Sequence, residues 1–332
     1  MIYIGIDPSS ESFTAALDPN PTTRSFANTQ SGIATFLEWL QEQRVSRDAV
    51  RICVENTGVY AEVLCYQLHE SGYSLSLLDP RKVWKAFGDG QPKSDPLDSR
   101  KIAEYARRYA DQLRLWQPQE VLVEQIQVIL STREQLVQQK TATQNARSTL
   151  ARKVIQTPAA NRALEATLTH LKHEITALEE ELQRLIRSHP TLLQGVSLLM
   201  TAPGVGWLLG AQFLVLTKGF REIPGYRRLA QYLGVSPNEH TSGTSVRKRA
   251  RSRRYGPSTA RKLLHLAARS LRTHDQEARH YFLRKTAEGK PKSLVLNNIA
   301  NQLLKRLCAM LRTQTPYIRG YRSLNPRFLA LA

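Results

Sequence analysis

The chain begins with Met1-Ile2-Tyr3-Ile4-Gly5-Ile6-Asp7, an apolar run that predicts a buried β-strand with an acidic residue at its end. Gly5 has no side chain, so another backbone could pack closely against this strand. Apolar and β-branched residues continue the pattern and predict three successive strands, at Ile2–Ile6, Phe13–Leu17 and Arg24–Ala27. The first two are expected to pair as a hairpin.

Helix and strand signals then alternate. Helical spacing over Ile33–Glu42 is followed by a strand at Ile52–Val54, a helix at Tyr60–Glu70 and a strand at Leu75–Leu78. Three strands followed by alternating helices and strands is the order of a ribonuclease-H-like (RuvC-like) α/β fold. We therefore expect residues 1–114 to form such a domain.

The charge of the 332-residue chain is concentrated at one end. The net charge is +19, and residues 218–332 hold 25 Lys and Arg but only 5 Asp and Glu. A concentrated basic domain is typical of proteins that bind the phosphate backbone of nucleic acids. Cys53, Cys65 and Cys308 lie far apart, which argues against a disulfide framework or a zinc site and favours a reducing compartment.

The middle of the chain has the pattern of a coiled coil. Seven apolar residues are spaced alternately by four and three: Leu164, Leu168, Leu171, Ile175, Leu178, Leu182 and Leu185. The preceding predicted helix, Gln119–Val154, has a poorer seam because its register meets Arg133, Lys140 and Arg147. We predict that residues 115–190 form a coiled-coil connector, either an antiparallel hairpin or a dimerising coil, and favour a role in oligomerisation.

Residues 191–332 are predicted to be mainly helical, with a long polar loop at His240–Gly256. Pro190–Thr217 is apolar and uncharged, but Pro203 and Gly204 interrupt it, so we expect two buried helices rather than a membrane span. The turn Pro203-Gly204-Val205-Gly206 resembles a helix-hairpin-helix element, whose backbone N–H groups at Gly204 and Gly206 could face a phosphate. The same turn could also be purely structural.

Four carboxylates are candidates for a metal site. Asp7 and Glu55 end two predicted buried strands, and Asp95 and Asp98 are three residues apart at a predicted helix start. Individually, they could serve as turn acceptors, as a helix cap or as first-turn charges. Together they offer the hard oxygen ligands that phosphoryl transfer needs to hold Mg²⁺.

A serine beside a glycine lies in the basic loop, at Ser242. From composition alone its role stays open, because such a serine could attack a phosphodiester, bind phosphate without reacting, or simply be solvated. The basic side chains that follow are candidates for nucleic-acid binding: Arg247, Lys248, Arg249, Arg251, Arg253 and Arg254.

Five motifs in this order resemble a known family. They are Ile4-Gly5-Ile6-Asp7, Glu55-Asn56-Thr57-Gly58, Asp95-Pro96-Leu97-Asp98, Pro203-Gly204-Val205-Gly206 and Ser242-Gly243-Thr244-Ser245-Val246-Arg247. The chain resembles the DEDD-type insertion-sequence transposases that carry a catalytic serine, the bridge-RNA-guided recombinases. One departure is the unusually basic run after the serine motif.

The resemblance implies a RuvC-like domain, a coiled-coil connector and a C-terminal transposase domain at residues 191–332. It also implies that Asp7, Glu55, Asp95 and Asp98 bind Mg²⁺, and that Ser242 forms a transient phosphoserine link. A noncoding bridge RNA would pair with donor and target DNA, and dimers would assemble into a tetramer. No membrane partner is expected. The expected location is the bacterial or archaeal cytoplasm, in association with the nucleoid.

Two other functions remain open. The first is a metal-only, RuvC-like, junction-resolving nuclease in which Ser242 only binds phosphate. The second is a nucleic-acid-binding protein whose acidic cluster is degenerate. All three bind nucleic acid in a salt-dependent way, so only chemistry distinguishes them.

Overall fold

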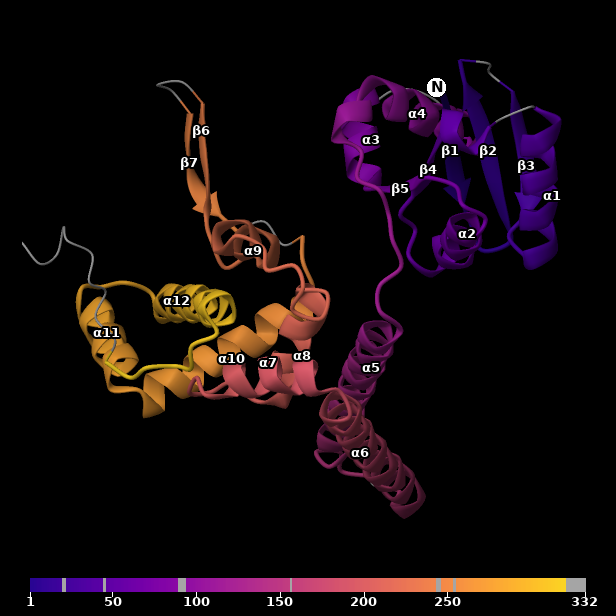
Figure 1. Cartoon of the computed structure of the whole chain (residues 1–332). Coiled ribbons are helices and arrows are strands. Elements are labelled where there is room, and N and C mark those ends of the chain that lie inside the picture. Colours follow the sequence, from indigo (N-terminus) through magenta and orange to yellow (C-terminus); the bar gives the residue numbers. More distant parts are fainter. Residues whose placement is uncertain are drawn as a thin grey trace, which may run out of the picture. The chain divides into compact units, whose positions relative to one another are not determined.

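The computed structural model describes residues 1–19, 22–43, 46–88, 94–155, 157–242, 246–252 and 255–320, and for residues 238–251 it describes the backbone alone. The chain divides into two compact units, Met1–Pro118 and Gln119–Ala332. Figure 1 shows an α/β first unit, a long helical hairpin and a mainly helical remainder.

The first unit is built on a five-stranded mixed sheet with the order β3-β2-β1-β4-β5. The first three strands are antiparallel, whereas β4 and β5 continue from β1 in parallel. Their bounds are β1 Ile2–Pro8, β2 Ser12–Asp18, β3 Thr23–Ala27, β4 Val50–Glu55 and β5 Leu75–Leu78. This arrangement is compatible with the ribonuclease-H-like fold that the sequence predicts.

Helices pack on both faces of the sheet because side chains alternate along each strand. Ile4 and Ile6 belong to the same buried cluster as residues of α1 (Gln30–Glu42) and α2 (Val59–Glu70). Tyr3 and Cys53 belong instead to a cluster with α3 (Pro80–Phe87) and α4 (Asp95–Arg108). The described residues of this unit also include two short 3₁₀ turns, Arg47–Ala49 and Ala110–Gln112.

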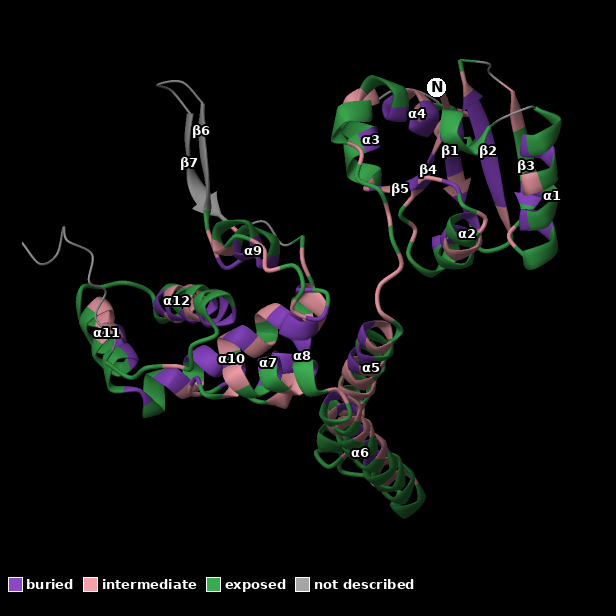
Figure 2. Ribbon diagram, in the orientation of Figure 1, coloured by how far each residue is buried: buried purple, intermediate pink, exposed green. Residues whose placement is uncertain are grey.

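The second unit starts with an antiparallel helical hairpin, α5 (Val121–Leu150) and α6 (Pro158–Arg187). Arg133 pairs with Glu179 and Arg147 pairs with Glu165. Residue numbers therefore rise along α5 while those of the partners fall along α6, as expected for antiparallel helices. The predicted heptad residues Leu168, Leu171, Ile175 and Leu182 are buried, while exposure rises around the hairpin's turn (Figure 2).

Of the two predicted arrangements of these helices, the structure adopts the hairpin within one chain. Arg133 and Arg147, which weakened the predicted seam of α5, are the residues that form ion pairs across it. The base of the hairpin packs against the following helices, because Val123, Ile126 and Leu182 share a buried cluster with them. The predicted division of the chain at residues 114 and 190 stays a prediction.

In the rest of this unit, as far as the structure describes it, six helices pack around one buried cluster. They are α7 Pro190–Met200, α8 Trp207–Leu216, α9 Tyr226–Leu233, α10 Ser258–His274, α11 Gln276–Ala287 and α12 Lys292–Thr313. In the described part of the chain, none of the helices has the length and apolarity needed to cross a membrane.

The predicted loop at His240–Gly256 is wrong in part. The backbone forms a two-stranded antiparallel hairpin, β6 (Asn238–Ser242) and β7 (Val246–Arg251). Polar and basic residues hid the strands, because no apolar alternation marks strands that need not cover a core.

The three cysteines are free and buried. Burial raises the pKa of Cys53 and Cys65 to about 12 and that of Cys308 to about 11. Their thiols therefore stay protonated at neutral pH and are not nucleophiles.

Candidate functional site

Asp7 and Glu55 lie at the same edge of the sheet. β1 and β4 are parallel neighbours whose register pairs Gly5 with Cys53 and Ile6 with Val54, so the next residues along are Asp7 and Glu55. Alternation puts Asp7 on the same face as Gly5, and Glu55 on the same face as Cys53. This is the face that α4 covers.

Helix α4 runs antiparallel to β1, and two contacts fix its direction. A Cβ on Gly5 would lie 2.1 Å from the Ser99 carbonyl oxygen and 2.3 Å from the Ala103 nitrogen, so the middle of the strand touches the helix backbone. Near the other end of the helix, Arg107 Nε is 3.1 Å from Asp18 Oδ2, and Asp18 is paired with Tyr3 near the start of β1. The first turn of α4 therefore points toward the end of β1.

That first turn carries the other two predicted carboxylates. Ser94 is the N-cap, Asp95 the first helical residue and Asp98 part of the first turn. The Lys101 ammonium lies 3.1 Å from Asp98 Oδ1, and both side chains are about four-fifths buried. The first turn of α4, with Asp95 and Asp98, thus covers the face of the sheet that carries Asp7 and Glu55 and lies toward the same edge.

The structure does not draw these acids into a finished metal site. Among the residues it describes, no group of three or more His, Cys, Asp or Glu side chains is close enough to hold one ion. The donor types nevertheless fit a hard divalent cation, since all four are carboxylates. Thr57 Oγ1, two residues after Glu55, is buried without a hydrogen-bond partner in the described chain and adds an oxygen at this edge.

The predicted helix-hairpin-helix turn joins α7 to α8. Gly204 has a φ of +78°, and a Cβ there would lie 2.9 Å from the Ala267 carbonyl oxygen of α10, so packing as well as conformation requires glycine. Gly206 is the N-cap of α8, is exposed, and has open space where a Cβ would stand. The structural role of Gly204 is therefore established, and contact with DNA at either glycine stays a prediction.

Ser242 is the last residue of β6 and lies opposite Val246 of β7. The base of this hairpin is tied to α9, because Gly256 N donates to the Tyr232 carbonyl oxygen at 2.7 Å. A Cβ on Gly256 would lie within 2.9 Å of the Tyr232 ring. Arg261 of α10 also donates to the Leu233 carbonyl oxygen at 3.1 Å.

The basic residues after Ser242 are described less fully. Arg247, Lys248, Arg249 and Arg251 lie on β7, but their side chains, like that of Ser242, are outside the described residues. Arg253 and Arg254 are outside them entirely. Their predicted roles stay predictions.

Three features of these regions were not predicted from the sequence. The pairing of Lys101 with Asp98 could have been predicted, because the two residues are three positions apart on a helix. The contact between Gly256 and Tyr232 could not have been predicted, because a glycine after a basic run does not reveal which ring packs against it.

Two family models of known proteins match the parts of the chain that contain these regions. A family model described as a transposase, of the DEDD type found in IS110 elements, matches residues 4–155 and so spans all four carboxylates. A second model, described as the transposase IS116/IS110/IS902 family, matches residues 196–283, which include Gly204, Gly206 and Ser242. The chain belongs to this family of transposases.

Relatives extend the match along the chain. The pilin gene-inverting protein of Moraxella lacunata is 26% identical over 325 residues, which cover 95% of this transposase and 97% of the relative. An uncharacterized 44.8 kDa protein of insertion element IS116 from Streptomyces clavuligerus is 24% identical and is matched over 94% of both chains. An uncharacterized 43.6 kDa protein of IS110 from Streptomyces coelicolor is 31% identical over 155 residues, which cover 47% of this chain and 37% of that protein.

The transposase is therefore a DNA-processing enzyme of an IS110-type element. Its DEDD-type domain is the kind that uses a divalent metal ion. The use of a divalent metal ion agrees with the carboxylate side chains, Asp7 and Glu55, at the ends of β1 and β4.

Proposed function

We propose that this transposase cuts and rejoins DNA by attack of the Ser242 hydroxyl on a phosphodiester, assisted by Mg²⁺ at Asp7, Glu55, Asp95 and Asp98. The observation that carries the proposal is the convergence of the ends of β1 and β4 with the start of α4 on one face of the sheet. Four carboxylates from three elements at one edge exceed what capping or turn formation requires.

The chemistry conserves phosphodiester bonds. Ser242 Oγ loses its proton and bonds to phosphorus, the bond from phosphorus to the 3′ oxygen breaks, and that oxygen leaves as a hydroxyl. A 3′-hydroxyl of another strand then attacks the phosphoserine and releases Ser242. Because each step exchanges one phosphate ester for another, rejoining needs no external energy source.

The acidic residues would support these exchanges by holding the cation. Bound Mg²⁺ supplies charge neutralisation at the phosphate oxygens and at the leaving oxygen. Asp7 and Glu55, at the ends of paired strands, are suited to a fixed position. Asp98 would exchange its Lys101 contact for the cation, so Lys101 becomes available to a phosphate.

Guidance by RNA and assembly into tetramers belong to the same proposal. The net positive charge of residues 218–332 and the basic run from Arg247 to Arg254 provide backbone binding for both nucleic acids. A bridge RNA would select donor and target by base pairing. The α5–α6 hairpin would mediate assembly between protomers.

A covalent trap tests the nucleophile. Wild type, Ser242→Ala and the control Ser236→Ala are incubated with the RNA, donor DNA, target DNA and Mg²⁺, then denatured. We expect a protein–DNA adduct in wild type and Ser236→Ala and none in Ser242→Ala. Strand cutting by Ser242→Ala at the wild-type rate would refute the serine mechanism and favour the metal-only nuclease.

Sequencing of the copurifying RNA tests guidance. We expect one transcript of the element, with segments complementary to the donor and target. Random cellular RNA would contradict guidance while leaving the serine test unaffected. For assembly, polar substitution of Val128, an exposed apolar residue of α5, should lower the mass in solution, and an unchanged mass of the folded variant would contradict the role of this face of the hairpin.

A further inference from the structure

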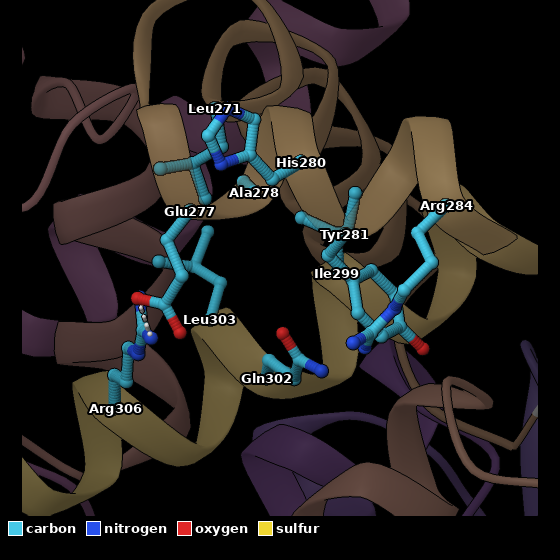
Figure 3. Close-up of a pocket in the computed structure, with 10 residues that line it drawn as sticks. All are labelled: Leu271, Glu277, Ala278, His280, Tyr281, Arg284, Ile299, Gln302, Leu303 and Arg306. Carbon is cyan, nitrogen blue, oxygen red and sulfur yellow. Dashed lines mark hydrogen bonds and ion pairs between the residues drawn. The ribbon is translucent and has the colours of Figure 1, made fainter. Parts of the chain in front are cut away.

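A cavity of about 400 Å³ lies between α11 and α12, next to the end of α10. None of the sites described above uses its residues. Four side chains that line it are apolar and almost fully buried: Leu271, Ala278, Ile299 and Leu303. Polar side chains of α11 and α12 line the remainder, and Figure 3 shows them arranged around the opening.

One side of the cavity is an ion pair that is already satisfied. Arg306 Nη2 lies 2.8 Å from Glu277 Oε2, and Arg306 Nη1 donates to the Tyr317 hydroxyl at 2.8 Å. These contacts neutralise the acid and fix the guanidinium. The carboxylate of Glu277 therefore does not make this cavity repel an anion.

The opposite side combines an aromatic ring with a cation. The Arg284 guanidinium lies 5.9 Å from the centre of the Tyr281 ring, and Asn298 Nδ2 donates to the Tyr281 hydroxyl at 3.2 Å. The ring is thus held from α12. The Gln302 amide lies between this pair and the Glu277–Arg306 pair (Figure 3).

We propose that this cavity binds one unpaired nucleotide of a single strand. The base would lie against the Tyr281 ring and the apolar wall, with its polar edge at Gln302, and the phosphate would bind Arg284. Unpaired bases are recognised in this manner, by stacking on aromatic rings or guanidinium groups and by hydrogen bonds to their edges. The volume falls within the range of small-ligand sites.

Simpler ligands fit the cavity less well. An inorganic anion would use Arg284 but leave the apolar wall without a partner, whereas an apolar molecule would leave Arg284 and Gln302 without hydrogen bonds. A nucleotide satisfies both parts. The domain around the cavity is also the strongly basic part of the chain, which attracts polynucleotides.

The inference deepens the proposed function, because strand exchange exposes unpaired nucleotides, and it names where one of them is held. Its test does not depend on the serine chemistry. Binding is measured in chelator, so cleavage cannot take place, and the result is independent of whether Ser242 reacts.

The experiment uses the full chain and fluorescence anisotropy at one fixed salt concentration. The probes are short labelled single strands of thymidine or uridine nucleotides and a labelled DNA duplex. Arg284→Ala and Tyr281→Leu should weaken single-strand binding by about tenfold, the scale of losing one base–aromatic stack, and duplex binding much less. Tyr281→Phe retains the ring and should bind as wild type does.

Arg279→Ala is the matched control, because Arg279 is an exposed arginine of the same helix that does not line the cavity. This substitution should weaken the binding of all three probes slightly and to the same extent. If Arg284→Ala and Tyr281→Leu lose binding to the uridine strand alone, the site is assigned to RNA, and if they lose binding to the thymidine strand alone, it is assigned to DNA. Loss of binding to both strands indicates a site for either. If Arg284→Ala resembles Arg279→Ala with every probe, the proposal is overturned.

Discussion

The carboxylate edge and the serine hairpin are held in place by different means. β1 has hydrogen-bonded neighbours on both sides, and its Gly5 touches the backbone of α4. In the described residues, β6 pairs with β7 in a separate two-stranded sheet, and near the hairpin's base Gly256 N donates to the Tyr232 carbonyl oxygen of α9. Isolated two-stranded hairpins are only marginally stable.

This difference separates stability from activity. The strands and the helix that carry the acids pack in the core of their unit, so changes to this supporting backbone should destabilise that unit. The serine hairpin belongs to a separate two-stranded sheet, so changes to its base should disturb the chemistry while the fold survives. Variants at Asp7, Gly5 and Gly256 test this contrast.

The largest effect is expected for Asp7→Asn. The neutral amide is a weak ligand for a hard cation, so we expect strand cutting to fall by ~10³-fold or more, equivalent to ~4 kcal/mol in the barrier. Thermal stability should be unchanged or higher, because one charge leaves a group of acids. Cutting assays and melting curves measure both. Asp48→Asn, an exposed acid on a 3₁₀ turn, is the control, and equal activity of the two variants would contradict the metal role.

Gly5→Ala should be the most destabilising of the backbone changes. The new Cβ would meet the Ser99 carbonyl at 2.1 Å and push α4 away from β1. Overpacking of this kind lowers the free energy of unfolding by about 1–3 kcal/mol. Denaturant titration measures the change. Gly225→Ala, where no atom lies within 4 Å of the Cβ position, should have little effect, and similar losses in both would argue against the close contact.

Gly256→Ala should separate activity from stability. A Cβ would lie 2.7 Å from the Tyr232 carbonyl oxygen, so the base of the serine hairpin must shift. We expect about a tenfold loss of covalent adduct, or ~1.4 kcal/mol, because small misplacement of a reacting group is costly. Global unfolding should move far less than for Gly5→Ala. A loss of stability equal to that of Gly5→Ala would break the contrast between the two regions.

The smallest effect concerns His265 of α10. Burial, with help from Arg261 and Arg269, lowers the pKa of His265 below its ordinary value. The unfolded chain therefore binds this proton more readily, and the stability contributed by His265 falls as the pH drops through the ordinary value of ~6.5.

His265→Gln should remove this dependence. The fall in melting temperature between about pH 7.5 and about pH 5.5 should be smaller in the variant than in wild type. His274→Gln, at the exposed end of the same helix, should retain the wild-type slope. Identical slopes in His265→Gln and wild type would show that His265 makes no such contribution.

Local sequence patterns predicted most of the elements. The strands of the first unit match their predicted positions to within about two residues, because apolar alternation and buried runs report which face of a strand is covered. Two buried helices over Pro190–Thr217 and a mainly helical C-terminal part were likewise predicted, and α7 to α12 bear this out. The β6–β7 hairpin was not predicted, because its polar and basic sequence has no apolar alternation.

By itself, the sequence determined which residues carry charge, which strands end on carboxylates and where the heptads lie, since these follow from residue type and spacing. Tertiary structure decided that α5 and α6 pair with each other, through contacts such as that of Arg133 with Glu179, which lies 46 positions further along the chain. It also decided the direction of α4, through the contacts of Gly5 and Arg107, and so the edge at which Asp95 and Asp98 join Asp7 and Glu55. Such contacts join distant parts of the chain, and no local pattern records them.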